Sequence, residues 1–208
     1  MKKVLFSLFT FLIVGVSMQA QTAKEWLDRV SDTYQKIPTY YIKFEMKESN
    51  GAKPEKGEVF ASRDKYSLDV IGIKKLYDGK TLYTISKEDK EVTVSNPKPD
   101  SDDLLTPTKV LRMYKSGYTT SLCKVSTING HKVQLIRLTP QNNSNTNYIE
   151  VAVNVADNTL EQYKEVFKSA ESRTITVKEY IENLIIPRSL FKFDQSKYEK
   201  DGYIVTEL

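Results

Sequence analysis

The stretch that decides the fold runs from Lys56 to Ser95 and reads KGEVFASRDKYSLDVIGIKKLYDGKTLYTISKEDKEVTVS. Short apolar and aromatic runs alternate here with turn-forming pairs: Arg63-Asp64, Asp78-Gly79 and Glu88-Asp89. The Asp-Gly pair is a strong hairpin signal, because a tight hairpin turn needs positive φ angles that glycine adopts without strain. The runs lie too close together for the crossover of about a dozen residues that parallel neighbours need. The pattern therefore predicts four or five antiparallel strands in an up-and-down sheet.

The first twenty residues have the pattern of a secretory signal peptide. Two lysines near the start precede an apolar run from Val4 to Val16, and small residues follow up to Ala20. This arrangement predicts export, with cleavage near Ala20. The apolar run is shorter than the roughly 20 residues of a membrane-spanning helix, which argues against a retained anchor. We expect residues 1–20 to be removed and residues 21–208 to form a single domain.

Composition argues against several kinds of site. The formal net charge is +4, and subtracting the signal-peptide residues Lys2 and Lys3 leaves +2, which does not suit a nucleic-acid groove. The chain has one cysteine, Cys123, so an internal disulfide is impossible. The chain also has a single histidine, His131. One cysteine and one histidine are too few ligands for a zinc site of the usual nitrogen and sulfur type. His131 follows a hairpin turn, where an exposed residue is expected rather than a catalytic base. We expect no enzyme activity, no metal and no cofactor.

Residues 22–36 are predicted to form an amphipathic helix. Thr22 and Glu25 have capping-box spacing, and Pro38 ends the helix. Its apolar stripe is made of Trp26, Leu27, Val30 and Tyr34. The next segment, 39–49, alternates between apolar and polar residues and is therefore a strand with one apolar face. The helix must pack its stripe against the sheet.

Residues 96–105 interrupt the strand pattern with two prolines and three acidic residues. Pro107 then suits the first turn of a short helix that Gly117 ends. The apolar side chains of this segment are Leu104, Leu105, Val110, Leu111, Met113 and Tyr114. Two interpretations fit equally: a fixed plug of the core, or a mobile lid across the mouth of the sheet.

The rest of the chain adds strands, with a second strong hairpin turn at Asn129-Gly130. The whole count is about ten or eleven antiparallel strands and two helices. A sheet this wide curls, because each strand is rotated against its neighbour. The prediction is a mainly-β fold with helices, an incomplete (open) antiparallel β-barrel covered by the N-terminal helix and the short lid helix.

Several stretches in this order resemble the LolA family of periplasmic carriers of outer-membrane lipoproteins, in the form found in the Bacteroidetes branch. They are the helix 23–36, the strand Tyr40–Met46, GEVFASR at Gly57–Arg63, YDGKTLY at Tyr77–Tyr83, the segment with Pro107, and FKFD at Phe191–Asp194. The resemblance covers nearly all of the chain after the signal peptide and lies in the order and spacing of these stretches.

The resemblance implies a periplasmic chaperone that shields lipoprotein acyl chains in the hollow of an open barrel. Its partners would be an inner-membrane ABC transporter that releases lipoproteins and an outer-membrane acceptor, and we expect a monomer. Arg63 matches a family arginine that ties the barrel to the lid. The family usually has proline next, whereas this chain has Asp64, so Arg63 could instead pair locally with Asp64 or Asp69.

The carrier hypothesis places an acyl-chain cavity on the apolar phase of the strands. The predicted lining residues are Tyr40, Ile42, Phe44, Met46, Val59, Leu82, Ile149, Val151 and Val153. The same residues could instead form an ordinary filled core without a cavity. A slip of one residue in the pairing of a strand would turn its apolar side chains to the outer face. The alternative function is a binding module of the same fold that senses lipids or lipoproteins. An enzyme is disfavoured, because the carboxylates Glu45, Glu58 and Asp69 fall on the outward phase.

Overall fold

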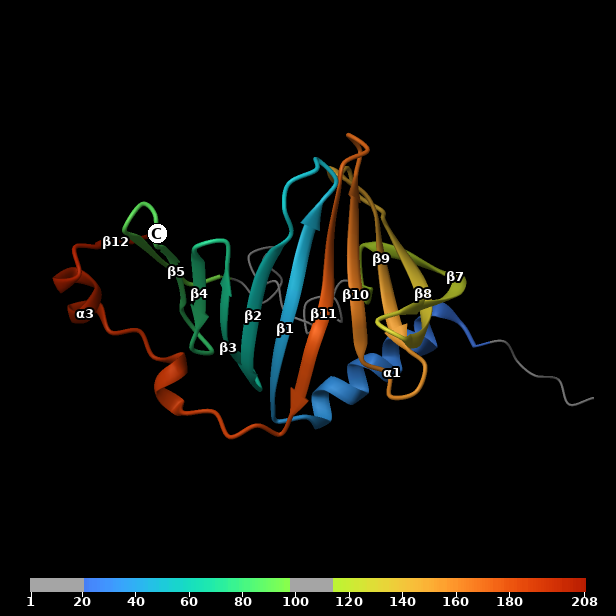
Figure 1. Ribbon diagram of the computed structural model, residues 1–208, viewed down its shortest axis with the longest axis horizontal. Coiled ribbons are helices and arrows are strands. Elements are labelled where there is room, and N and C mark those ends of the chain that lie inside the picture. The colour runs from blue at the N-terminus through green and yellow to red at the C-terminus, as the bar shows by residue number, and fades with distance from the viewer. Residues whose placement is uncertain (1–20, 98–113) are drawn as a thin grey trace, which may run out of the picture.

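The computed structural model describes residues 21–97 and 114–208. The predicted signal peptide lies outside these ranges, as do the predicted lid residues Leu104, Leu105, Val110, Leu111 and Met113. The described residues form one wide, twisted sheet with helices beside it (Figure 1). The elements are α1 (Ala23–Lys36), β1 (Thr39–Glu48), β2 (Glu55–Ser62), β3 (Lys65–Val70), β4 (Ile73–Tyr77), β5 (Leu82–Ser86), β6 (Glu91–Ser95), β7 (Tyr118–Ile128), β8 (His131–Pro140), β9 (Thr146–Asn154), β10 (Leu160–Phe167), β11 (Ser172–Glu182), the 3-10 helix η1 (Arg188–Phe191), α3 (Gln195–Lys200) and β12 (Ile204–Glu207).

The sheet has twelve strands in the order β12-β6-β5-β4-β3-β2-β1-β11-β10-β9-β8-β7. Strands β1 to β6 form the predicted meander, and β11 then pairs with the free side of β1 and begins a second meander that ends at β7. The mainly-β open sheet with an N-terminal helix is thus confirmed. Two details differ: the strand count is higher than expected, and β12 runs parallel to β6. The long connection after β11 makes this possible, because a parallel neighbour needs a crossover.

The strand register separates an inner, apolar face from an outer face that is charged on β1 to β3 and carries a small second apolar cluster on β8 and β9. One inner row crosses five strands, each residue paired with the next: Tyr40, Ala61, Tyr66, Tyr77 and Leu82. Helix α1 lies on this inner side and crosses from β7 towards the start of β1 (Figure 1). Its Leu27 and Val30 are fully buried, and the predicted capping box between Thr22 and Glu25 is present.

The outer face carries the predicted carboxylates. Glu58 accepts a hydrogen bond from the Tyr41 hydroxyl, and Asp69 forms an ion pair with Lys87 at 2.7 Å. Part of this face is covered by residues 183–203, which we call the C-terminal strap. Its Phe193 ring stacks on Tyr83 with centroids 4.4 Å apart, and the Tyr198 ring stacks on Phe193 at 5.1 Å. The strap explains why Leu76, on the outer face, is only 3% exposed.

Two predicted hairpin turns differ in detail. Asn129 and Gly130 both have positive φ (52° and 84°), as the tight turn between β7 and β8 requires. The Asp78-Gly79 pair instead belongs to a four-residue loop between β4 and β5. There the Asp78 carboxylate accepts the backbone N–H groups of Lys80 and Thr81, both at 2.9 Å. A side chain that bonds its own backbone replaces the two-residue turn that the sequence suggested.

Candidate functional site

The nine residues predicted to line a cavity all lie on the inner face. They come from β1, β2, β5 and β9 and belong to a single apolar cluster under α1. Met46 is partly buried, and each of the other eight is at most 7% exposed. These strands therefore turn their apolar side chains towards α1 and do not present them to solvent.

Further members of this inner layer were not among the predicted lining residues. They are Leu27, Val30 and Tyr34 of α1, Tyr66 and Leu68 of β3, and Ile136 and Leu138 of β8. Alternation carries the signal at Leu68, whose two neighbours in sequence are polar, but not at Ile136, which directly follows Leu135, a buried residue of a second apolar cluster. The apolar layer therefore extends from the first meander to the second, beneath both halves of the sheet.

Three tyrosines meet where α1 reaches the start of β1. The ring of Tyr34 lies edge-on to Tyr40 at 5.6 Å between centroids, and Tyr180 of β11 lies 5.9 Å from Tyr34 and 6.3 Å from Tyr40. Burial raises the pKa of Tyr34 and of Tyr180 well above the ordinary tyrosine value. Both hydroxyls therefore stay neutral, and this part of the layer offers aromatic surface without charge.

Gly57 lets the layer pack closely at β2. Its cross-strand partner is Phe44, and a Cβ placed on Gly57 would lie 2.3 Å from Cζ of the Phe44 ring. The ring thus occupies the space that any other residue at position 57 would fill. The glycine that opens the GEVFASR stretch is there to seat an inner-layer aromatic side chain.

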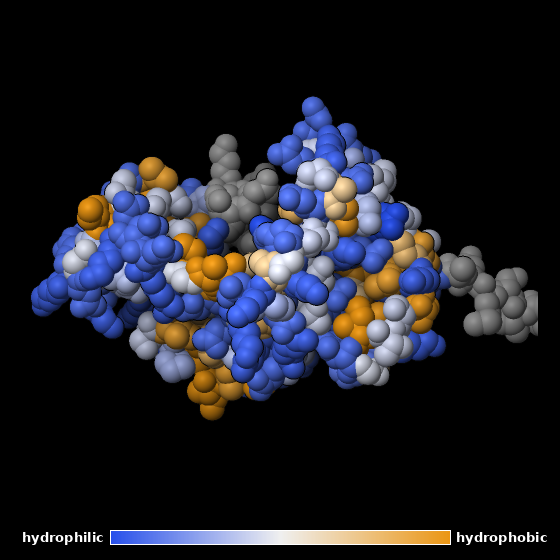
Figure 2. Space-filling model, turned by 45° about the horizontal axis from the view of Figure 1, so that its top comes forward, coloured by the Kyte–Doolittle hydropathy of each residue, from blue (hydrophilic) through white to orange (hydrophobic). Residues whose placement is uncertain are grey.

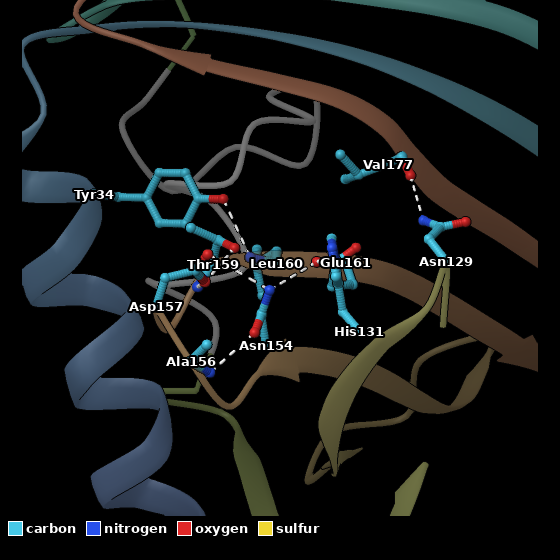
Figure 3. Close-up of polar contacts among 10 residues, drawn as sticks. All are labelled: Tyr34, Asn129, His131, Asn154, Ala156, Asp157, Thr159, Leu160, Glu161 and Val177. Atoms are coloured by element: carbon cyan, nitrogen blue, oxygen red, sulfur yellow. Dashed lines mark hydrogen bonds and ion pairs between the residues drawn. The ribbon is translucent and has the colours of Figure 1, made fainter. Parts of the chain in front are cut away.

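Side-chain hydrogen bonds replace the backbone ladder where β10 and β11 separate. The ladder between these strands ends at Gln162 and Thr176, although β11 continues to Glu182. Beyond that point the Tyr34 hydroxyl accepts the backbone N–H of Leu160 at 3.3 Å, and Nδ2 of Asn129 donates to the Val177 carbonyl at 2.7 Å (Figure 3). We call this region the seam. Helix α1 and the tip of the β7–β8 hairpin both contribute to it.

A buried carboxylate lies beside the seam. Glu161 Oε1 is 2.5 Å from Nδ1 of His131 and accepts Nδ2 of Asn154 at 3.0 Å (Figure 3). The Glu161 side chain is 8% exposed, and that of His131 is 57% exposed. His131 is therefore exposed, as predicted, but it is the first residue of β8 and its side chain also joins the β7–β8 hairpin to β10. In residues 21–97 and 114–208 no group of three His, Cys, Asp or Glu side chains could hold a metal ion.

Tyr114 is the one predicted lid residue within the described chain. It is 5% exposed, and its hydroxyl donates to Oδ1 of Asp28 on α1 at 2.6 Å. Hydrogen bonds from Lys24 and then Tyr114 lower the pKa of Asp28, whereas burial and the Asp28 carboxylate raise the pKa of Tyr114. Tyr114, the first described residue after the 98–113 segment, is thus hydrogen-bonded to α1.

Arg63 lies at the exposed turn between β2 and β3. Its φ is 54°, and its backbone N–H donates to the Pro38 carbonyl at 3.0 Å. Asp69, one of its two suggested local partners, is paired with Lys87 instead. The tether between Arg63 and the lid stays a prediction, because the segment it would hold lies outside the described residues.

Comparison with solved structures finds this fold in proteins of very different sequence. An uncharacterized conserved protein from Thermus thermophilus is similar with a TM-score of 0.63 at 11% identity, over 89% of this chain and 99% of that chain. MucB is similar with a TM-score of 0.50 at 12% identity, over 83% of this chain and 63% of the MucB chain, so this chain spans less than two thirds of MucB. A LolA superfamily protein from Nitrosomonas europaea has a TM-score of 0.38 at 12% identity, over 84% of this chain and 99% of that chain.

No protein-family model matches the chain, and no curated protein matches its sequence. The solved structures therefore show a shared fold alone. In the described part of the chain, no helix is both long and apolar enough to cross a bilayer.

Proposed function

We propose that the protein is a periplasmic carrier that shields the acyl chains of lipoproteins and ferries them from the inner to the outer membrane. The observation that supports this proposal is the continuous apolar inner face, which runs from β5 through β1 to β9 and is built from the nine predicted residues. In this proposal the side chains of the inner layer bind acyl chains, and Arg63 and residues 104–114 act as tether and lid. The partners would be an inner-membrane ABC transporter and an outer-membrane acceptor, with the carrier a monomer.

The energetics require a surface of this kind. Burying one methylene group stabilises by roughly 0.8 kcal/mol, so a chain of about 16 carbons gains on the order of 10 kcal/mol. Only a broad apolar surface can match that gain. Release then requires a competitor for the same surface, and apolar side chains such as Leu111 and Met113 would supply it by refilling the site as the cargo leaves.

A charge on the inner face tests the proposal. Phe44→Glu places a carboxylate in the apolar layer and is expected to abolish retention of a triacylated lipopeptide in the soluble fraction, because an unpaired buried charge is strongly disfavoured. Lys47→Glu is the matched control, since it introduces the same residue on the exposed side of β1. Far-UV circular dichroism confirms that both variants are folded. Undiminished lipopeptide binding by folded Phe44→Glu would refute the inner face as the acyl site.

A further inference from the structure

Three segments that are distant in sequence meet at one end of the sheet. The Asn183 backbone N–H donates to the Thr39 carbonyl at 2.8 Å, and the Thr39 hydroxyl donates to the Leu184 carbonyl at 2.7 Å. The β2–β3 turn joins them through the bond from Arg63 N–H to the Pro38 carbonyl. We call residues 36–39, 63–65 and 183–188 the basal tip. These hydrogen bonds hold the three segments of the basal tip together, so their exposed side chains belong to one surface.

An aliphatic side chain projects from the basal tip. Ile185 is 95% exposed, more than any other large hydrophobic residue of the described chain, and Ile181 on the adjoining end of β11 is 39% exposed. Figure 2 shows hydrophobic side chains protruding at the lower edge of the molecule, where Figure 1 places the loop between β11 and η1. Single exposed apolar residues are common on protein surfaces, so exposure alone would not assign a role. The charges around this one supply the second observation.

Positive charge predominates within the basal tip. It carries four exposed cationic residues, against Asp64 within it and Glu182 next to it. The cations are Lys36, Arg63, Lys65 and Arg188. Four positive charges against two negative charges leave a net charge of +2 at this end. An exposed apolar side chain on a surface rich in lysine and arginine is a combination that binds the interface of an anionic bilayer, since insertion and attraction to acidic headgroups add together.

We propose that the basal tip docks the protein on anionic lipid bilayers, with Ile185 inserted among the acyl chains and the surrounding cations on the lipid headgroups. This inference rests on the proposed carrier function and names the surface at which cargo is exchanged. Tyr40, the first residue of the inner row, directly follows Thr39 of the basal tip. Docking in this orientation brings the Tyr40 end of the apolar layer towards the membrane, so that in this proposal an acyl chain passes between the two with little exposure to water.

Vesicle flotation tests the docking surface. The mature protein is mixed with vesicles of phosphatidylethanolamine and phosphatidylglycerol, and separately with vesicles of phosphatidylcholine alone. We expect binding to the anionic vesicles that weakens with added salt, as screening requires. Ile185→Ser should bind the anionic vesicles about tenfold more weakly. The free energy of moving one isoleucine side chain from water into the bilayer corresponds to a change in affinity of about this size. Ile204→Ser is the control, since Ile204 is 66% exposed on β12 at the sheet edge and should bind as the wild type does.

Three results would overturn the proposal: no flotation of the wild type, equal flotation with both kinds of vesicle, or an equal loss in Ile185→Ser and Ile204→Ser. A dimer detected by light scattering that Ile185→Ser abolishes would also overturn it, by assigning the tip to a second copy of the chain. Lipopeptide binding without vesicles is measured on the same variants. Lipopeptide binding without flotation refutes the docking surface alone, and flotation without lipopeptide binding refutes the carrier function alone.

Discussion

Gly57→Ala is a small change with a calculable effect on the inner layer. Gly57 lies in a strand without a positive φ, so alanine would be free of backbone strain and would by itself stabilise the strand by about 0.5–1 kcal/mol. Its Cβ, however, would lie 2.3 Å from the Phe44 ring and 3.0 Å from Cβ of Val70. Forcing an extra methyl group into a closely packed site costs typically about 1–3 kcal/mol. We therefore expect a net loss of about 1–2 kcal/mol in the free energy of unfolding.

Urea unfolding of a double-mutant cycle measures this effect. Phe44→Leu removes the part of the ring that the new Cβ would contact, so the double variant should be no less stable than Phe44→Leu alone. The displaced ring in Gly57→Ala should also weaken binding of a fluorescent fatty acid, and the double variant should recover it. Stability of Gly57→Ala at or above that of the wild type, or additive losses in the cycle, would refute the packing that we describe.

Two further predictions concern the attachments of α1 and of the β7–β8 hairpin. The pKa of Asp28 is lowered from its usual 3.8, so its contribution to stability is present above that pH and is lost as pH falls through the lower, folded value. The pKa of Tyr114 is raised, so its contribution is complete below about pH 10 and is lost as pH rises through the higher, folded value. Tyr114→Phe should flatten both limbs of a plot of unfolding free energy against pH, and unchanged limbs would contradict the bond to Asp28. Asn129→Gly keeps the positive φ but removes the hydrogen bond to the Val177 carbonyl, so it should lower the free energy of unfolding by about 0.5–1.5 kcal/mol. It should also speed amide hydrogen exchange of Leu160 at the seam. Exchange of Leu160 at the wild-type rate would show that the seam does not depend on Asn129.

The inner face could be predicted from the sequence because strand periodicity is local. Tyr40, Ile42 and Phe44 alternate with polar residues, and burying one set fixes the register of the whole strand. The capping box of α1 and the Asn129-Gly130 turn are local for the same reason, since the residues that form them are at most three positions apart.

The remaining features depend on contacts between distant residues. The bond from Asn129 to Val177 joins residues 48 positions apart, and nothing in either segment marks the other as its partner. The stacking of Phe193 on Tyr83 and the parallel pairing of β12 with β6 are of the same kind. Helix α3 has only six residues, too few for a clear helical period, so the sequence pattern does not predict it.

Native mass spectrometry of the mature protein recovered from a periplasmic extract tests the central claim most directly. The carrier account predicts a complex whose added mass equals that of a triacylated lipoprotein, and that mass identifies the cargo. Phe44→Glu, recovered in the same way, should carry none. A protein that shows only its own mass, in the extract and again after incubation with purified lipoprotein, would contradict the account and would mean that the inner layer is filled by its own side chains.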